Sequence, residues 1–156
     1  MIRKLLSIMM LAAVAMLGMQ CSTVSKLEKE AYQVRYLPLN NYFVRNDIEA
    51  TKLQKLIITN ETDFRSFFGE AAVMGRNGHP TPVNFKTEYV LAVILPETDR
   101  STDVTVLDVL QNGNSVIFNY HVERGEKNSY SLVPFAAVSL PKPRTTQNME
   151  FYFNKK

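Results

Sequence analysis

Tyr89-Val90-Leu91-Ala92-Val93-Ile94-Leu95 is the stretch that decides the fold, because it is apolar at every position. A short continuous apolar run that is rich in β-branched residues is typical of a strand covered on both faces. We therefore expect residues 89–95 to form the central strand of a sheet. Other layers of structure should then pack on both sides of that sheet.

The residues that follow this strand predict a hairpin. Residues 104–110 are apolar on both sides of their alternation, and Asn112-Gly113 favours the positive backbone dihedrals of a tight turn. The return strand alternates with period two. The residues expected to face inward are Val116, Phe118, Tyr120 and Val122, and those expected to face outward are Asn119, His121 and Glu123.

A further turn and two strands complete the carboxy-terminal part. We expect a turn at 124–128, a strand over 130–140 and a last alternating strand over 149–153. Pro134 falls inside the 130–140 run and has no N–H to donate to a strand ladder. This strand is therefore expected to lie at a sheet edge or to be bulged at Pro134.

Upstream of the central strand, the sequence predicts short strands. Residues 32–36 alternate with period two, which indicates a half-buried strand. Pro38 and Asn40-Asn41 break this strand. Pairing is expected to resume at 42–44 and again at 55–59.

The one helix predicted with capping signals spans Asn60 to Ala72. Asn60 is a favourable N-cap, and Asp63 places a carboxylate in the first turn, where it meets the positive end of the helix dipole. Apolar residues follow at the helical spacing, namely Phe64, Phe67, Phe68 and Ala71. We interpret this stripe as part of the hydrophobic core rather than as a ligand-binding platform.

These elements predict a single α+β domain over 31–156. A chain of 156 residues with 46% hydrophobic and 21% charged residues has ordinary globular composition and is too short for several typical domains. Successive strands with short turns favour a mainly antiparallel meander, arranged as a sandwich or an open barrel, with one early amphipathic helix.

The amino-terminal segment, residues 1–20, is predicted to be a secretory signal peptide. Arg3-Lys4 precedes the apolar stretch 5–17, and a polar run begins at Ser22. The apolar stretch is shorter than the roughly 20 residues that a spanning helix needs, so a retained transmembrane anchor is the weaker interpretation.

Cys21 lies where the apolar segment turns polar, and the chain has no second cysteine. The sequence Leu17-Gly18-Met19-Gln20-Cys21 resembles the lipobox of bacterial lipoproteins, although Gln20 stands where a small residue is common. The resemblance implies that the thiol is acylated and that the lipid holds the protein on a membrane of the bacterial cell envelope, on its periplasmic or surface side. Residues 21–30 would then be a tether. Plain cleavage after Ala13-Val14-Ala15 remains the alternative.

The charge of the chain makes nucleic acid an unlikely partner class. The formal charge is +3, and removal of Arg3-Lys4 with the signal peptide leaves 16 basic and 15 acidic residues, a net charge of +1. Phosphate backbones are bound by a concentrated basic field. No Lys/Arg-rich run in the sequence would supply one.

Catalytic, metal and cofactor motifs are missing from the sequence. It contains no Gly-x-Ser-x-Gly elbow, and His79 and His121 have no Cys or His at metal-ligand spacing. We therefore expect a non-enzymatic protein without a metal or a cofactor. The residues that we single out for partner binding are His79, Asp99, Arg100 and Pro134, which lie in the loops and at the expected edge strand.

Two stretches of the sequence resemble a known family. Val83-Asn84-Phe85-Lys86-Thr87-Glu88-Tyr89-Val90-Leu91-Ala92-Val93 is similar to the "DFSKE-VVVAV" opening of the PrcB-like carboxy-terminal domain, the protease-complex stability subunit family. Residues 131–142 look like the later "PY-IVKIPK" strand of that family, and the resemblance covers about 53–153. The family commonly has a glycine pair after the central strand, where this chain has Thr98-Asp99-Arg100-Ser101-Thr102.

The resemblance implies a non-enzymatic exported module that associates with a protease and stabilises it. Our leading hypothesis is thus an envelope lipoprotein that binds a protein partner, with an exported protease as the candidate. The alternative is a small-ligand carrier, which would use its aromatic residues to line a cavity of about 300 to 1,000 Å³. A third hypothesis, a hydrolase, requires His79 or His121 to lie within hydrogen-bond reach of a hydroxyl or carboxylate.

Overall fold

The computed structural model describes residues 23–71, 78–143 and 148–156. The expected signal peptide 1–20 and the expected lipidation site Cys21 lie outside these residues. Within the described part of the chain, no helix is long and apolar enough to cross a membrane. Residues 23–29, which belong to the expected tether, are helical.

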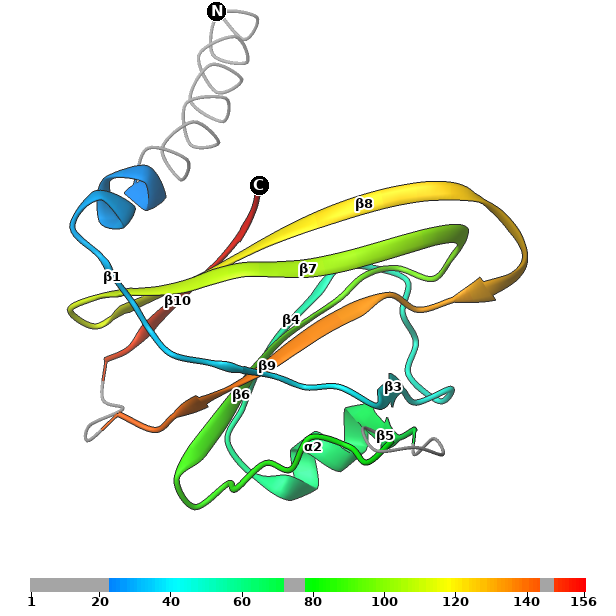
Figure 1. Ribbon diagram of the computed structural model, residues 1–156, viewed down its shortest axis with the longest axis horizontal. Helices are drawn as coiled ribbons and strands as arrows, with labels where there is room; N and C mark the ends of the chain where they lie inside the picture. The colour runs from blue at the N-terminus through cyan, green and yellow to red at the C-terminus, as the bar shows by residue number, and fades with distance from the viewer. Residues whose placement is uncertain (1–22, 72–77, 144–147) are drawn as a thin grey trace, which may run out of the picture.

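The domain is built on two four-stranded sheets and a small two-stranded one (Figure 1). The first sheet has the order β1-β7-β8-β10. Its strands are β1 (Tyr32–Gln33), β7 (Thr98–Asn112), β8 (Ser115–Leu132) and β10 (Glu150–Lys155). We call it sheet A.

The second four-stranded sheet, sheet B, has the order β2-β9-β6-β4, and all of its pairs are antiparallel. Its strands are β2 (Leu37–Pro38), β9 (Phe135–Pro141), β6 (Glu88–Ile94) and β4 (Gln54–Ile58). The two-stranded sheet pairs β3 (Tyr42–Val44) with β5 (Phe68–Glu70), and α2 (Glu61–Phe67) precedes β5 directly.

Strand β6 has the central position that its apolar sequence predicts. It lies between β9 and β4, and its residues from Tyr89 onward are buried. Alternate side chains serve two cores: Leu91 belongs to the cluster between sheets A and B, whereas Val90 belongs to the cluster between sheet B and α2. The α+β class with a sheet sandwich is therefore confirmed, with three layers that Figure 1 shows from sheet A through sheet B to α2.

The hairpin is much longer than the sequence predicts. Strand β8 continues through 124–128, where we expected a turn, and the strand that we expected over 130–140 begins only at Phe135. The reason is that β8 stays paired with β7 beyond Arg124. Irregularities in the register between Thr98 and Thr102 accommodate the additional residues of β8. The turn at the other end consists of Gly113 and Asn114, and Gly113 has a positive φ of 57°.

The last strand departs from a simple meander. Strand β10 pairs with β8 in parallel, with Phe151 opposite Val116 and Phe153 opposite Phe118. The Phe153 ring packs against the Phe118 ring in a tilted arrangement, with ring centroids 5.4 Å apart. The chain reaches this position because β9 belongs to sheet B and the connection returns from there to sheet A.

Helix α2 begins as predicted and ends earlier. The side chain of Asn60 accepts a hydrogen bond from the Asp63 N–H at 2.8 Å, which confirms the N-cap. The helix stops at Phe67, and Phe68 is already extended, with φ −121° and ψ 134°. Tertiary pairing outweighs the helical stripe here, because Phe68 and Gly69 form β5 opposite β3 while Phe68 still reaches the core.

Asn119 is the clearest error of the alternation argument. It was expected to face outward into water, yet it is only 2% exposed. Its amide donates to the Asp108 carboxylate at 2.7 Å and its carbonyl accepts from Asn154 at 2.9 Å. The amino-terminal helix is bound to the same group, because Asn154 and Lys156 both donate to Glu28.

Candidate functional site

The residues that the sequence singled out for partner binding do not form one site. His79 is exposed, and its backbone carbonyl accepts a hydrogen bond from the Asn41 amide at 2.9 Å. Asp99 and Arg100 are exposed at the start of β7, where Lys127 pairs with Asp99 at 3.0 Å. Pro134 is buried between β8 and β9, and its carbonyl accepts from the Leu95 N–H at 2.8 Å.

The two histidines make no catalytic arrangement with the groups that contact them. The Nδ1 of His121 lies 3.0 Å from the backbone carbonyl oxygen of Lys156, and the ring is exposed on β8. Among the described residues, neither imidazole has a hydrogen bond to a side-chain hydroxyl or a side-chain carboxylate, and no cluster of three His, Cys, Asp or Glu side chains could hold a metal ion.

One side of the sandwich is open, and the segment from β1 to β3 crosses it. This segment pairs first with β7 of sheet A through β1, then with β9 of sheet B through β2, and last with β5 through β3. Figure 1 shows it running diagonally in front of both sheets. Because it leaves β7 after two paired residues, it leaves most of the β7 edge uncovered.

The uncovered edge contains one regular stretch, residues 102–106. These five residues pair without interruption with β8, from Thr102 opposite Arg124 to Val106 opposite Tyr120. Irregularities bound the stretch on both sides, between Arg100 and Thr102 and between Val106 and Asp108. On the open side, the Tyr36 hydroxyl donates weakly to the Val106 carbonyl at 3.5 Å.

A groove of about 320 Å³ lies beside this stretch, and we call it the open-side groove. One wall is Val104–Val106 of β7, the other is the crossing segment from Tyr36 to Asn40, and the floor is Phe135–Ala137 of β9. The walls belong to different sheets, so the groove opens directly onto the core between them. It has both backbone and apolar side chains to offer a ligand.

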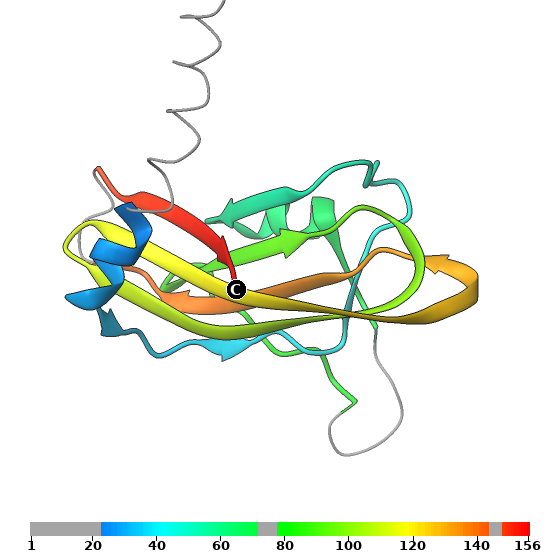
Figure 2. The same ribbon diagram turned by 90° about the horizontal axis from the view of Figure 1, so that it is seen from above.

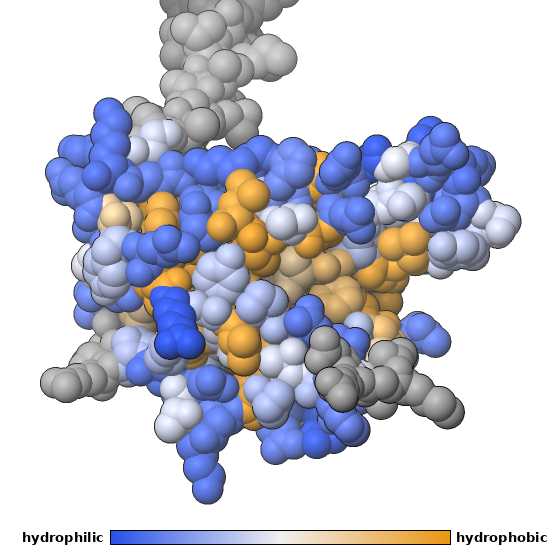
Figure 3. All heavy atoms as spheres, viewed as in Figure 1, coloured by the Kyte–Doolittle hydropathy of each residue, from blue (hydrophilic) through white to orange (hydrophobic). Residues whose placement is uncertain are grey.

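A second hollow of about 460 Å³ extends the apolar surface toward β3. It shares Phe135 with the open-side groove and includes Phe43, whose side chain is 43% exposed, together with Leu132 and Val133. Figure 3, which faces this side, shows hydrophobic side chains gathered where β8 ends and β9 begins. The apolar surface of the open side is thus continuous across Phe135.

Acidic side chains lie on the outer face of the same stretch of β7. Asp103 stands directly opposite Glu123 of β8, and both are exposed. Within the described residues neither carboxylate forms an ion pair. Two like charges directly opposite each other are mildly destabilising, so this point of the surface favours a cation.

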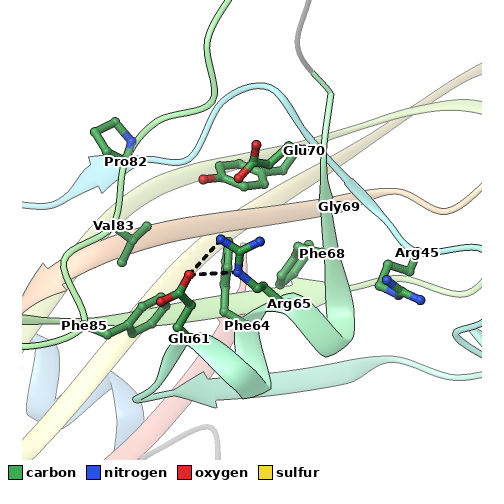
Figure 4. Close-up of a pocket in the computed structure, with 11 residues that line it drawn as sticks. Arg45, Glu61, Phe64, Arg65, Phe68, Gly69, Glu70, Pro82, Val83 and Phe85 are labelled. Atoms are coloured by element: carbon green, nitrogen blue, oxygen red, sulfur yellow. Dashed lines mark hydrogen bonds and ion pairs between the residues drawn. The ribbon is translucent and has the colours of Figure 1, made fainter.

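A third hollow, of about 560 Å³, is a polar cleft over α2 (Figure 4). Its floor is aromatic: Phe64 lies 5.1 Å from Tyr42 and 5.6 Å from Phe85 between ring centroids. Figure 4 shows Pro82, Val83 and Phe85 along one side, Glu70 across from them and Arg45 at the far end. We call it the α2 cleft.

The charges in the α2 cleft are largely paired with one another. Arg65 binds Glu61 at 2.7 Å, and Arg45 binds Asp47 at 3.0 Å. Burial and the nearby Glu70 carboxylate raise the pKa of the Tyr42 hydroxyl, which donates to the Thr81 carbonyl at 2.9 Å. The cleft therefore presents an aromatic floor under neutralised charges, a surface that suits small uncharged or zwitterionic groups.

No motif in the sequence points directly to the open-side groove. Val104 and Val106 were recognised as strand residues, and Tyr36 as part of an alternating strand, but nothing in the sequence tells which strand edge stays unpaired. A local signal existed for Phe135, because it follows Pro134 at a break in the apolar run. Only the pairing of the strands brings these four residues together.

Comparisons with known proteins place the chain in no family. No family model, no curated protein and no solved structure matches it.

Proposed function

We propose that this protein is a lipid-anchored lipoprotein of the bacterial envelope whose domain binds a protein partner through the open side of the sandwich. The observation that carries the proposal is the regular stretch 102–106 of β7, whose edge facing away from β8 has no paired strand and lies beside the apolar open-side groove. Open strand edges are usually short, bulged or covered, because they pair readily with other chains. An edge that is left regular beside an apolar groove is therefore a candidate binding surface.

The anchor half of the proposal rests on Cys21 and on the way the amino-terminal helix is held. Two peptide steps separate Cys21 from Thr23, a reach of at most about 7 Å, and the helix 23–29 begins there. Glu28 ties this helix to Lys156 at 2.8 Å, and the Leu27 carbonyl accepts from Asn112 at 3.1 Å. A lipid on Cys21 would therefore hold the domain close to the bilayer at the end that carries the β7–β8 turn.

The position of the open side relative to this end suits a domain that presents its binding surface away from the membrane. Figure 2 shows the amino-terminal helix at the end of sheet A, away from the opposite end where the long β7–β8 ribbon extends. With the helix end toward the lipid, the ribbon and the apolar surface around Phe135 would face away from the bilayer. A partner in the periplasm or outside the cell could then reach the open side.

The partner class that we propose is an exported protease, and the protein would stabilise it without catalysis of its own. This choice rests on the resemblance of residues 83–93 and 131–142 to the PrcB-like domain. In this chain those residues include most of β6 and all of β9, the two central strands of sheet B, together with the segment that leads into β6 and the end of β8. We assign no catalytic role to any of these residues.

Cys21→Ala tests the anchor. The proposal predicts that the wild-type protein fractionates with membranes, that its amino terminus carries acyl chains by mass spectrometry, and that the variant becomes soluble. Ser22→Ala is the matched control and should stay in the membrane. An unmodified sulfur at Cys21 in the native protein would disprove the lipid anchor while leaving the binding surface untouched.

A small-ligand carrier is the second candidate, and the α2 cleft favours it. The volume of about 560 Å³ falls within the range of small-molecule sites, and the aromatic floor suits a planar ligand. Native mass spectrometry of protein purified from its own envelope tests this candidate. A bound small molecule that is retained by the wild type and lost from Phe85→Ala would support the carrier; a ligand-free wild type would remove it.

A further inference from the structure

We propose that the open side binds an extended, basic segment of its partner, which adds as a fifth strand to sheet A along residues 102–106 of β7. This inference deepens the proposed function, on which it rests, by naming the kind of partner segment. It depends on three independent observations: the direction of the free backbone groups, the apolar groove beside them and the unpaired acidic side chains on the outer face.

The backbone of β7 has free hydrogen-bonding groups that point to the open side. In an antiparallel pair, the N–H and C=O of one residue point to the same side, and successive residues alternate. The Val106 carbonyl receives the Tyr36 hydroxyl on the open side, so Thr102 and Val104 also direct their backbone groups there. Asp103 and Thr105 point toward β8 instead.

The crossing segment supports this direction independently. Beyond the irregularity between Val106 and Asp108, the Val34 N–H donates to the Val109 carbonyl at 2.8 Å, and β1 then pairs with Leu110 and Gln111. One inserted residue shifts the alternation by one, which moves the open-side position from even to odd numbers. An added strand would therefore continue the edge that β1 already covers at the other end of β7.

Other edges of the two large sheets carry features that discourage pairing. Strand β4 contains Lys55 and β10 ends in Lys155, and lysine on an edge strand commonly protects against association. At the start of β7, the irregularities around Arg100 discourage pairing with another strand. The stretch 102–106 has neither a lysine nor a bulge within it.

Side chains of an added strand would find an apolar environment on the inner face. Val104 and Val106 pack against the cluster between sheets A and B. Because side chains alternate along a strand, every second residue of the partner segment would point inward beside these valines, above Phe135 and Ala136. Apolar residues at alternate positions of the segment fit this groove.

The outer face selects for positive charge. Since Val104 faces inward, Asp103 and Thr105 face outward, and Asp103 stands opposite Glu123. An outward side chain of the added strand would lie about 5 Å from Asp103, measured between Cβ atoms. Lysine or arginine at that position would relieve the repulsion between the two carboxylates.

A displayed library of random dodecapeptides, selected on the detergent-solubilised full chain, tests the specificity. The expected result is enrichment of peptides in which apolar residues alternate with lysine or arginine. Asp103→Lys should weaken the binding of an enriched peptide by roughly threefold to tenfold. Glu30→Lys changes the net charge equally at an exposed position of the tether, and it should leave the affinity unchanged.

Amide hydrogen exchange by NMR tests the mode of binding. On addition of an enriched peptide, the amides of Thr102, Val104 and Val106 should gain protection, whereas those of Asp103 and Thr105 are already protected by β8. Failure to enrich any peptide, or binding without protection at the three open-side amides, would overturn strand addition. The proposed function would fail in a different way. In that case the partner would bind at another surface, or the protein would have no partner.

Discussion

Replacing Asn119 by alanine should destabilise the protein far more than its place on an expected polar face suggests. The Asn119 side chain is 2% exposed and joins two strands, because its amide donates to Asp108 of β7 at 2.7 Å and its carbonyl accepts from Asn154 of β10 at 2.9 Å. Alanine removes both hydrogen bonds. It leaves the Asp108 carboxylate and the Asn154 amide without this partner.

The expected loss of unfolding free energy is about 2 to 3 kcal/mol. Each hydrogen bond contributes about 1 kcal/mol net, and a carboxylate or amide left unsatisfied in a partly buried site adds to that loss. For a domain of this size, a loss of 1 kcal/mol lowers Tm by roughly 2 to 5 °C. Asn119→Ala should therefore lower Tm by about 4 to 15 °C.

Urea and thermal unfolding followed by circular dichroism measure this effect on the soluble Cys21→Ala form. Asn114→Ala is the matched control, because Asn114 lies exposed in the β7–β8 turn, and its Tm should change little. In a double-mutant cycle, Asn119→Ala and Asn154→Ala should couple by at least about 0.5 kcal/mol. A loss below about 0.5 kcal/mol for Asn119→Ala, with no coupling, would refute the buried polar link between β7, β8 and β10.

Three further outcomes follow from single residues. Burial raises the pKa of the Glu28 carboxyl, but hydrogen bonding and the charge of Lys156 together outweigh burial and hold this pKa below its usual value. The ionised carboxylate therefore contributes its full stabilisation above about pH 4.5, and this stabilisation is lost as the pH falls further. Glu28→Gln should reduce the loss of stability at acid pH, measured by urea titrations at several pH values. Burial raises the pKa of Tyr89 to about 12, so unfolding should become easier as the pH rises above about 10, and Tyr89→Phe should remove part of that alkaline loss, measured by the same titrations. Gly113→Ala places a side chain at a φ of 57° and should cost about 1 kcal/mol by thermal unfolding, a conclusion that an unchanged Tm would contradict.

The fold was predictable where one strong local signal agreed with the tertiary structure. The apolar run of β6 identified the central strand, and the Asn60 side chain identified the start of α2. Both signals are local, because burial on two faces demands a continuous apolar run and a free N–H in the first turn demands a capping oxygen. Gly113 marked the hairpin turn for the same reason.

The errors arose where partners distant in sequence decide the outcome. Phe68 continues the helical stripe, but pairing with β3 places it in a strand while it keeps its place in the core. Asn119 has the polarity of a surface residue, but Asn154 and Asp108 satisfy it in a buried position. The turn expected at 124–128 is absent, since β7 offers β8 a partner along that length.

The candidate site was the least predictable part of the molecule. An unpaired strand edge is a property of the whole sheet order, and the sequence of residues 102–106 resembles that of any half-buried strand. The residues chosen from the sequence, such as His79 and Arg100, were chosen for exposure in loops. The open-side groove instead combines backbone groups of β7 with apolar residues of β9, and neither carries a chemical motif.

Photo-cross-linking in intact cells tests the central claim most directly. A benzophenone amino acid replaces Thr105, on the outer face of the open stretch of β7, and in a matched strain it replaces Ile57, which is 46% exposed on β4. We predict a specific covalent adduct with an envelope protein from position 105 and none from position 57. Equal adducts at both positions, or an adduct from position 57 alone, would contradict binding at the open side.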